Sequence, residues 1–107
     1  MIVTTTQTIP NREIKEILGV AHGIIVRTPT IKQGFFGGFK NIIGGQNSSY
    51  TQLCESAREQ AYNKLLEHAH SLGADAVVGL CFDSSELGGD QLRANEVFVY
   101  GTAVRLH

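Results

Sequence analysis

The sequence predicts an α+β domain: a mostly antiparallel sheet of about four strands, with one long helix and one short helix. Three observations support this fold class. A long stretch with helical periodicity occupies the middle of the chain, β-branched runs lie on both sides of it, and glycine clusters separate the segments. With 107 residues, the chain is long enough for one domain and too short for two. Residues 1–107 are therefore expected to form a single domain.

The first part of the chain is expected to contain two strands. Ile2–Thr6 is short and rich in β-branched residues, which predicts an opening strand. Ile14–Thr28 is expected to form a long strand, because it ends in a β-branched run before Pro29, where helix is disfavoured. Gly19 and Gly23 would weaken a helix here. Within a strand they indicate a bulge or the close approach of another backbone.

A short helix is predicted in the segment that follows, since its apolar residues recur with helical spacing. These residues are Phe35, Phe36, Phe39, Ile42 and Ile43. Gly37 and Gly38 lie inside the stripe, so this helix should need packing to persist. Gly44-Gly45 ends it, because a left-handed glycine commonly terminates a helix.

The long helix is predicted at Tyr50–Leu72. Ser49 and Gln52 form a capping-box pattern, and Gly73 stands where helices commonly end. One continuous apolar face consists of Tyr50, Leu53, Cys54, Ala57, Ala61, Leu65, Ala69 and Leu72. Two further residues, Tyr62 and Leu66, widen the apolar arc to about 220°, roughly twice the width that one sheet covers. The surplus flank is expected to pack against a second surface, most simply another subunit.

Two strands are expected after the helix, at Ala76–Ser84 and at about Arg93–Leu106, joined by a loop through Gly88-Gly89-Asp90. Simple alternation places Val78, Leu80 and Phe82 on one side of the first, and Val77, Gly79, Cys81 and Asp83 on the other. Both faces of the last strand are largely apolar, so both are expected to be covered. One helix covers only one face of a sheet, so a neighbouring subunit is the simplest second cover.

Composition and motifs argue against several classes of function. The formal net charge is −1, and no Lys/Arg cluster is longer than a pair, so nucleic acid is not an expected partner. The N-terminus does not resemble a signal peptide, and no apolar run approaches the roughly 20 residues that span a bilayer. A cytoplasmic protein without a membrane partner is expected. Motifs such as GxSxG and HExxH do not occur, so no enzyme is predicted.

The two cysteines, Cys54 and Cys81, are the candidate ligands for a soft metal ion. Thiolates suit thiophilic ions, but a stable site needs three or four converging ligands. Cys54 lies in the apolar stripe of the long helix, where a free thiol is usually buried. Cys81 shares its strand face with Asp83, and it points away from the helix if Val78, Leu80 and Phe82 face the helix. The two thiols therefore cannot share an ion within one subunit, although symmetry could gather copies of Cys81.

The histidines are expected to be structural or solvated. His68 and His70 are two residues apart on the helix, hence about 200° apart around its axis, and cannot bind the same ion. Glu67 and His70 form an ExxH pair that lacks the partner carboxylates of a metal-binding bundle. His22, within a strand pattern, is expected to be a satisfied structural residue.

Several segments together resemble a known family. They are Thr4-Thr5-Thr6, Phe35-Phe36-Gly37-Gly38-Phe39, Ile42-Ile43-Gly44-Gly45, Ser49-Tyr50 with Arg58 and Ala61, Leu72-Gly73-Ala74-Asp75-Ala76-Val77-Val78-Gly79 and Tyr100-Gly101-Thr102-Ala103-Val104. In these segments the chain resembles the YbjQ family of small bacterial proteins, which carries a heavy-metal-binding label. The resemblance implies a dodecin-like α+β subunit that assembles as a pentamer or as stacked pentamers. It implies no defined set of metal ligands.

Three functional hypotheses follow. The first is a non-enzymatic, ring-forming binding protein that holds a soft monovalent or divalent metal ion, with Cys81 as first ligand and Cys54 as second. The alternative is an oligomeric small-molecule-binding protein with apolar clefts between subunits. The aromatic residues expected to line these clefts are Phe35, Phe36, Phe39 and Tyr62. The third is an enzyme whose polar site is assembled from several chains.

Overall fold

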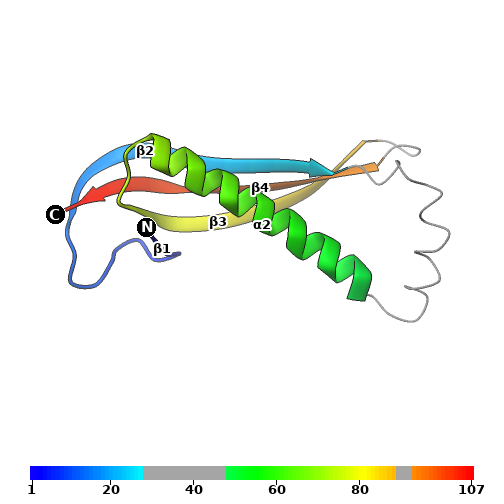
Figure 1. Ribbon diagram of the computed structural model, residues 1–107, viewed down its shortest axis with the longest axis horizontal. Coiled ribbons are helices and arrows are strands. Elements are labelled where there is room, and N and C mark those ends of the chain that lie inside the picture. The colour runs from blue at the N-terminus through cyan, green and yellow to red at the C-terminus, as the bar shows by residue number, and fades with distance from the viewer. Residues whose placement is uncertain (28–47, 89–92) are drawn as a thin grey trace.

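The computed structural model describes the backbone of residues 1–27, 48–88 and 93–107, and the side chains of residues 1–27, 54–86 and 95–107. The elements are β1 (Ile2–Val3), β2 (Ile14–Arg27), α2 (Ser48–Ser71), β3 (Ala76–Gly88) and β4 (Arg93–Leu106) (Figure 1). They confirm the predicted α+β class and the positions of the long helix and four strands. The short helix predicted through residues 35–43 lies outside the described residues, as does most of the Gly88-Gly89-Asp90 loop.

The four strands form one sheet in the order β1-β3-β4-β2. β1 is parallel to β3, and the other neighbours are antiparallel, so the sheet is mixed but mostly antiparallel. β1 is shorter than the predicted Ile2–Thr6, yet Thr4 and Thr6 continue along β3 through backbone hydrogen bonds to Gly79 and Leu80. β4 lies at the centre, paired along its length with both long strands.

Both glycines singled out in β2 have the predicted backbone roles. Gly19 has a φ of 137°, and the pairing of β2 with β4 shifts by one residue between Ile17 and Gly19, which marks a bulge. Gly23 is buried beneath α2, where an added Cβ would lie 2.1 Å from the carbonyl oxygen of Ala61. The helix and the strand therefore approach closely at Gly23.

The C-terminal end of α2 has the geometry that Gly73 predicts. Gly73 has a φ of 81°, and its N–H donates to the carbonyl of His70 at 2.9 Å. The N–H of Ala74 donates to the carbonyl of Ala69 at 3.1 Å, which completes a Schellman motif. Asp75 follows, and its carboxylate accepts the N–H of Leu106 at 2.9 Å. This hydrogen bond connects the turn after α2 to the end of β4.

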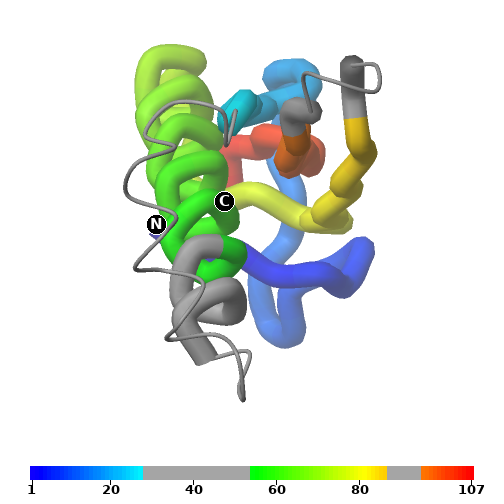
Figure 2. Tube along the Cα trace, turned by 90° about the vertical axis from the view of Figure 1, so that its right-hand side faces the viewer, coloured from blue at the N-terminus to red at the C-terminus, as the bar shows by residue number. Residues whose placement is uncertain are grey.

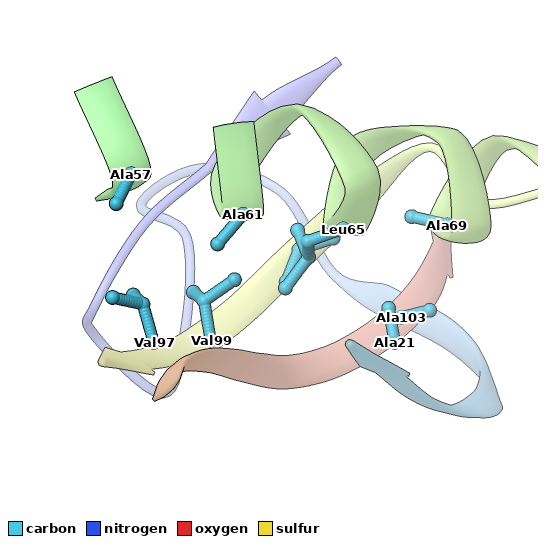
Figure 3. Close-up of a cluster of buried hydrophobic side chains, with 9 residues drawn as sticks. Ala21, Ala57, Ala61, Leu65, Ala69, Val97, Val99 and Ala103 are labelled. Carbon is cyan, nitrogen blue, oxygen red and sulfur yellow. The ribbon is translucent and has the colours of Figure 1, made fainter. Parts of the chain in front are cut away.

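The core lies between one face of α2 and one face of the sheet (Figures 2 and 3). The helix contributes Ala57, Ala61, Leu65 and Ala69, and the sheet contributes Ala21, Val77, Val97, Val99 and Ala103. All nine residues are buried. Because most of the helix residues are alanine, α2 can lie close to β2 and β4, with Leu65 filling the middle of the interface.

Cys54 is exposed, so the prediction that it would be buried in the helix core was wrong. Ala57 is the first buried residue of α2 among its described side chains. The N-terminal end of the helix lies away from the strands in Figure 1, because α2 crosses the sheet obliquely. Helical periodicity places Cys54 on the correct side of the helix, but it does not show where the sheet ends.

A smaller apolar cluster covers one end of the opposite face of the sheet. Its buried members are Ala76, Val78, Val104 and Leu106, with Ile9 and Ile14 packed against them. The segment before β2 reaches this position through a tight turn in which the N–H of Arg12 donates to the carbonyl of Ile9 at 3.2 Å. Pro10 and Asn11, which has a φ of 66°, occupy the two central positions, as a type II turn requires.

A bulge in β3 overturns the predicted alternation of its side chains. Gly79 has a φ of 66°, and the register with β4 shifts between Val78 and Cys81. Val78 is paired with Thr102 and Cys81 with Tyr100, so both point away from α2, while Leu80 packs against the helix-side core. The grouping of Val78 with Leu80 was therefore wrong. The predicted direction of Cys81 is confirmed, since it points away from the helix.

Candidate functional site

The candidate site lies on the sheet face that α2 does not cover, here called the open face. It consists of Ile17, Val20, His22, Ile24 and Val26 from β2, Phe98, Tyr100 and Thr102 from β4, and Cys81 and Asp83 from β3. Strand alternation and the two bulges place these residues on one side of the sheet. Figure 2 shows α2 on the other side, so within the described residues no helix covers the open face.

Large apolar side chains are exposed along β2 on this face. The exposed fractions are 69% for Ile17, 60% for Val20, 41% for Ile24 and 54% for Val26. They lie along one strand rather than being scattered, and Tyr100 on β4 is also exposed. A continuous apolar patch of this kind is typical of a surface that binds a partner. A neighbouring subunit as the second cover for β4 stays a prediction.

Cys81, Tyr100 and His22 form one row across β3, β4 and β2. Cys81 is paired with Tyr100, and Tyr100 is paired with His22. Neighbouring strands are about 4.8 Å apart, so Cys81 and His22 are separated by about 10 Å. Asp83 lies two residues beyond Cys81 on the same face. Cys81 therefore has a tyrosine and a carboxylate nearby, whereas the imidazole of His22 is out of reach.

The Cys81 thiol and the Tyr100 phenol lie side by side on paired strands. A hydrogen bond with the Cys81 side chain raises the pKa of Tyr100 above its ordinary value, and the negative charges of Cys81 and Asp83 act in the same direction. Each of these contacts disfavours a phenolate.

The described side chains of one subunit do not form a complete metal site. No group of three or more His, Cys, Asp and Glu side chains gathers within the described residues. Cys81 and Asp83 supply one soft and one hard donor, fewer than the three or four ligands that a stable site requires. The exposed Cys81 thiol fits a thiophilic ion only where a neighbouring chain supplies the remaining ligands. Cys54 is on α2, across the sheet, so the two thiols do not meet within one subunit.

Two aromatic side chains stack on the open face beside Cys81. The rings of Phe98 and Tyr100 have centroids 5.4 Å apart and an interplanar angle of 27°. His22 continues the series, with its ring centroid 6.1 Å from that of Phe98. The row presents flat aromatic surface on the same face as the exposed aliphatic residues of β2.

The structure brings together two histidines that the sequence did not pair. The ring centroids of His22 and His68 are 4.5 Å apart, and Nδ1 of His68 accepts the backbone N–H of His22 at 3.1 Å. The prediction considered His68 only with His70 on the same helix. Gly23 was the available signal, because a close helix approach at Gly23 brings one flank of α2 to the neighbouring His22.

The remaining predicted residues do not add to this site. Phe35, Phe36 and Phe39 lie outside the described residues, so the aromatic cleft predicted for small molecules is described only at Tyr62, which is half-buried. Glu67 and His70 are exposed on α2, as expected for a solvated helix face. In the part of the chain that the structure describes, no helix combines the length and apolarity that crossing a bilayer requires.

Comparison with known proteins identifies the family. The family model YbjQ_1, with the description "Putative heavy-metal-binding", matches residues 1–107. The chain belongs to the YbjQ family. Its YbjQ relatives include a UPF0145 protein from Francisella tularensis subsp. tularensis (strain WY96-3418), 55% identical over 104 residues that cover 97% of each chain. A UPF0145 protein from Legionella pneumophila (strain Corby) is 43% identical, and the match covers 97% of this chain and 96% of the relative.

A solved structure shares the fold of this YbjQ chain at low sequence identity. It is a protein of unknown function from Pediococcus pentosaceus ATCC 25745 that belongs to the DUF74 family. The TM-score is 0.69 with 17% identity, and the match covers 100% of this chain and 98% of the other. The similarity supports the α+β architecture and says nothing about the chemistry of the open face.

Proposed function

We propose that this protein is a cytoplasmic, non-enzymatic binding protein whose subunits assemble into a ring, as a pentamer or as stacked pentamers, and hold a soft metal ion at copies of Cys81. The observation that carries the proposal is the position of Cys81 on the open face. The same face presents a thiol, a tyrosine and a strip of exposed aliphatic side chains, so contact between subunits there would also bring ligands together.

The exposed strip on β2 supports assembly energetically. Complete burial of a large apolar side chain stabilises by about 1.5–3 kcal/mol, so burying the exposed parts of four such residues contributes about 3–7 kcal/mol. This gain is close to the lower estimates for the cost of association, about 4 kcal/mol. A lasting ring therefore needs additional contacts, which the half-buried helix flank of Tyr62 and Leu66 can provide.

The shape of the subunit also supports assembly. Its principal extents are 54 × 25 × 18 Å, and its Cα radius of gyration is 17.5 Å. A compact domain of this length has a radius of gyration of about 13 Å. The long antiparallel pair of β2 and β4 accounts for the elongation, because a 14-residue strand spans about 47 Å. Such a thin layer leaves much of its apolar surface for a neighbour to cover.

Assembly is tested by native mass spectrometry with one charged substitution on the open face. Val20→Lys should shift the protein toward monomer. Val20 is 60% exposed in the single chain, and contact between chains at this position would bury the lysine ammonium without a partner. Gln60→Lys is the matched control, because it adds the same charge on the exposed side of α2 and should leave the oligomer intact. A wild-type protein that is monomeric at micromolar concentration would refute assembly.

Metal binding is tested separately on reduced protein with Zn²⁺, Cd²⁺ and Cu⁺. The wild-type protein should bind with a fixed stoichiometry per ring, and Cys81→Ser should abolish binding while Cys54→Ser leaves most of it. Thiolate ligands favour these ions over Mg²⁺, so Mg²⁺ is the negative control. Equal metal binding by the wild-type and Cys81→Ser proteins, or binding by neither, would refute the metal proposal. Neither result would affect the proposal that the subunits assemble.

The alternative is an oligomeric protein that binds a small molecule between subunits. The stacked rings of Phe98 and Tyr100 on the open face favour an aromatic ligand, since offset stacking adds to the free energy of apolar burial. A ligand screen by thermal shift distinguishes the two functions. Stabilisation by more than about 1 kcal/mol at saturating ligand, retained in Cys81→Ser, would favour the small-molecule function.

A further inference from the structure

The contact between His22 and His68 lies at the free edge of the described sheet. β2 is the last strand in the order β1-β3-β4-β2, so alternate backbone N–H groups of β2 point away from β4. The N–H of His22 is one of these, and it donates to Nδ1 of His68 at 3.1 Å. His68 therefore satisfies an edge donor in the middle of a 14-residue strand.

This hydrogen bond identifies the tautomer of neutral His68. An Nδ1 atom that accepts a hydrogen bond carries a lone pair, so neutral His68 holds its proton on Nε2. Uptake of a second proton would place N–H on Nδ1, directed at the N–H of His22. Two donors cannot share a hydrogen bond, and the contact would be lost.

The charged groups around His68 come from α2, β2 and β4. From β2 it faces His22, whose ring centroid is 4.5 Å away. On α2, Lys64 is one turn before it, and from β4 the Arg105 guanidinium lies close to Gly73, one turn beyond it. The Arg105 guanidinium is itself 4.0 Å from the carboxylate of Glu16 on β2.

We propose that His68 is a proton-controlled cap on the free edge of the sheet. Neutral His68 accepts a hydrogen bond from the outward N–H of His22, and this bond holds the last turns of α2 against β2. Protonated His68 releases that N–H and exposes the middle of the β2 edge to solvent. The C-terminal turn of α2 persists, because its Schellman hydrogen bonds involve no side chain. Protonation of the imidazole therefore releases the cap. This inference does not depend on metal binding or on ring assembly.

The test measures amide hydrogen exchange of His22 by NMR on the whole protein, corrected for the intrinsic exchange rate at each pH. Loss of one hydrogen bond should reduce its protection about tenfold between pH 8 and pH 5. His68→Asn keeps an acceptor near the position of Nδ1 but does not titrate, so protection should become independent of pH. His70→Asn is the matched control on the same helix and should behave as wild type.

Two results would overturn the proposal. One is protection of His22 that does not change with pH in the wild-type protein, or that changes equally in His68→Asn. The other comes from the ring nitrogens of wild-type His68, whose tautomer can be read by ¹⁵N NMR even where a variant fails to fold. A neutral ring protonated on Nδ1 would exclude the hydrogen bond on which the cap depends.

Discussion

The close approach of α2 to β2 predicts that Gly23→Ala is strongly destabilising. Gly23 is buried, and a Cβ at this position would lie 2.1 Å from the carbonyl oxygen of Ala61 and 2.7 Å from the backbone nitrogen of Leu65. Unstrained contacts between heavy atoms are about 3.5 Å, so the helix would have to retreat by roughly 1 Å. Such a retreat loosens the packing of Leu65, the largest fully buried side chain on α2.

The magnitude follows from what obstructs the new methyl group. Overpacking of a core costs about 1–3 kcal/mol when side chains can adjust. At Gly23 the obstacles are backbone atoms of a helix, which cannot rotate away, so the cost should be at the upper end, about 3 kcal/mol. For an m-value of about 2 kcal/mol/M, the urea midpoint should fall by about 1.5 M.

The assay is equilibrium urea unfolding at one fixed protein concentration, since association would make stability depend on concentration. Gly19→Ala is the control: no atom lies within 4 Å of an added Cβ there, and only the φ of 137° is unfavourable. Its cost should be about 1–2 kcal/mol. The close packing of α2 on β2 is refuted if the free energy of unfolding of Gly23→Ala is within about 0.5 kcal/mol of the wild-type value. It is also refuted if Gly23→Ala is less destabilising than Gly19→Ala.

Three further predictions concern the core, the turn after α2 and the open face. Leu65→Ala should cost about 2–5 kcal/mol by leaving a cavity under α2, measured by the same urea assay. Asp75→Ala should cost about 1–3 kcal/mol because the N–H of Leu106 loses its acceptor, whereas Asp75→Asn retains a carbonyl oxygen and should cost less. Cys81→Ala should return the raised pKa of Tyr100 toward its ordinary value, seen as an earlier tyrosinate absorbance in alkaline titration. Because folding raises this pKa, the stabilising contribution of Tyr100 is complete below its unfolded pKa and is lost as the pH rises through the folded one. An unchanged titration curve in Cys81→Ala would contradict the thiol–phenol contact.

Much of the fold could be predicted because local patterns agreed with one another. The β-branched runs, the helical period and Gly73 define the long helix and the long strands within a few residues. Gly19 and Gly23 gave the correct backbone roles, since few other residues tolerate a positive φ or a backbone contact at Cβ. The boundaries of the elements and the roles of the glycines depend on residues close together in the sequence, so a single sequence is enough to predict them.

The site could be predicted only in part, because its arrangement depends on contacts distant in sequence. Cys81 was placed on the correct face, but by an alternation that the bulge at Gly79 breaks. Cys54 was expected to be buried because helical phase says nothing about the length of sheet beneath the helix. The contact between His22 and His68 spans 46 residues of sequence and follows from the crossing of α2 over β2.

The inserted residue at Gly79 has a consequence for variants that change the length of β3. Removing one residue between Val78 and Cys81 would leave these two residues two positions apart, so strict alternation would keep both side chains on the face away from α2. The thiol would still be paired with Tyr100, and Phe82 would stay on the side of α2. A shortened chain of this kind would lose the local distortion at Gly79 and keep the same chemical surface on each face of the strand beyond it.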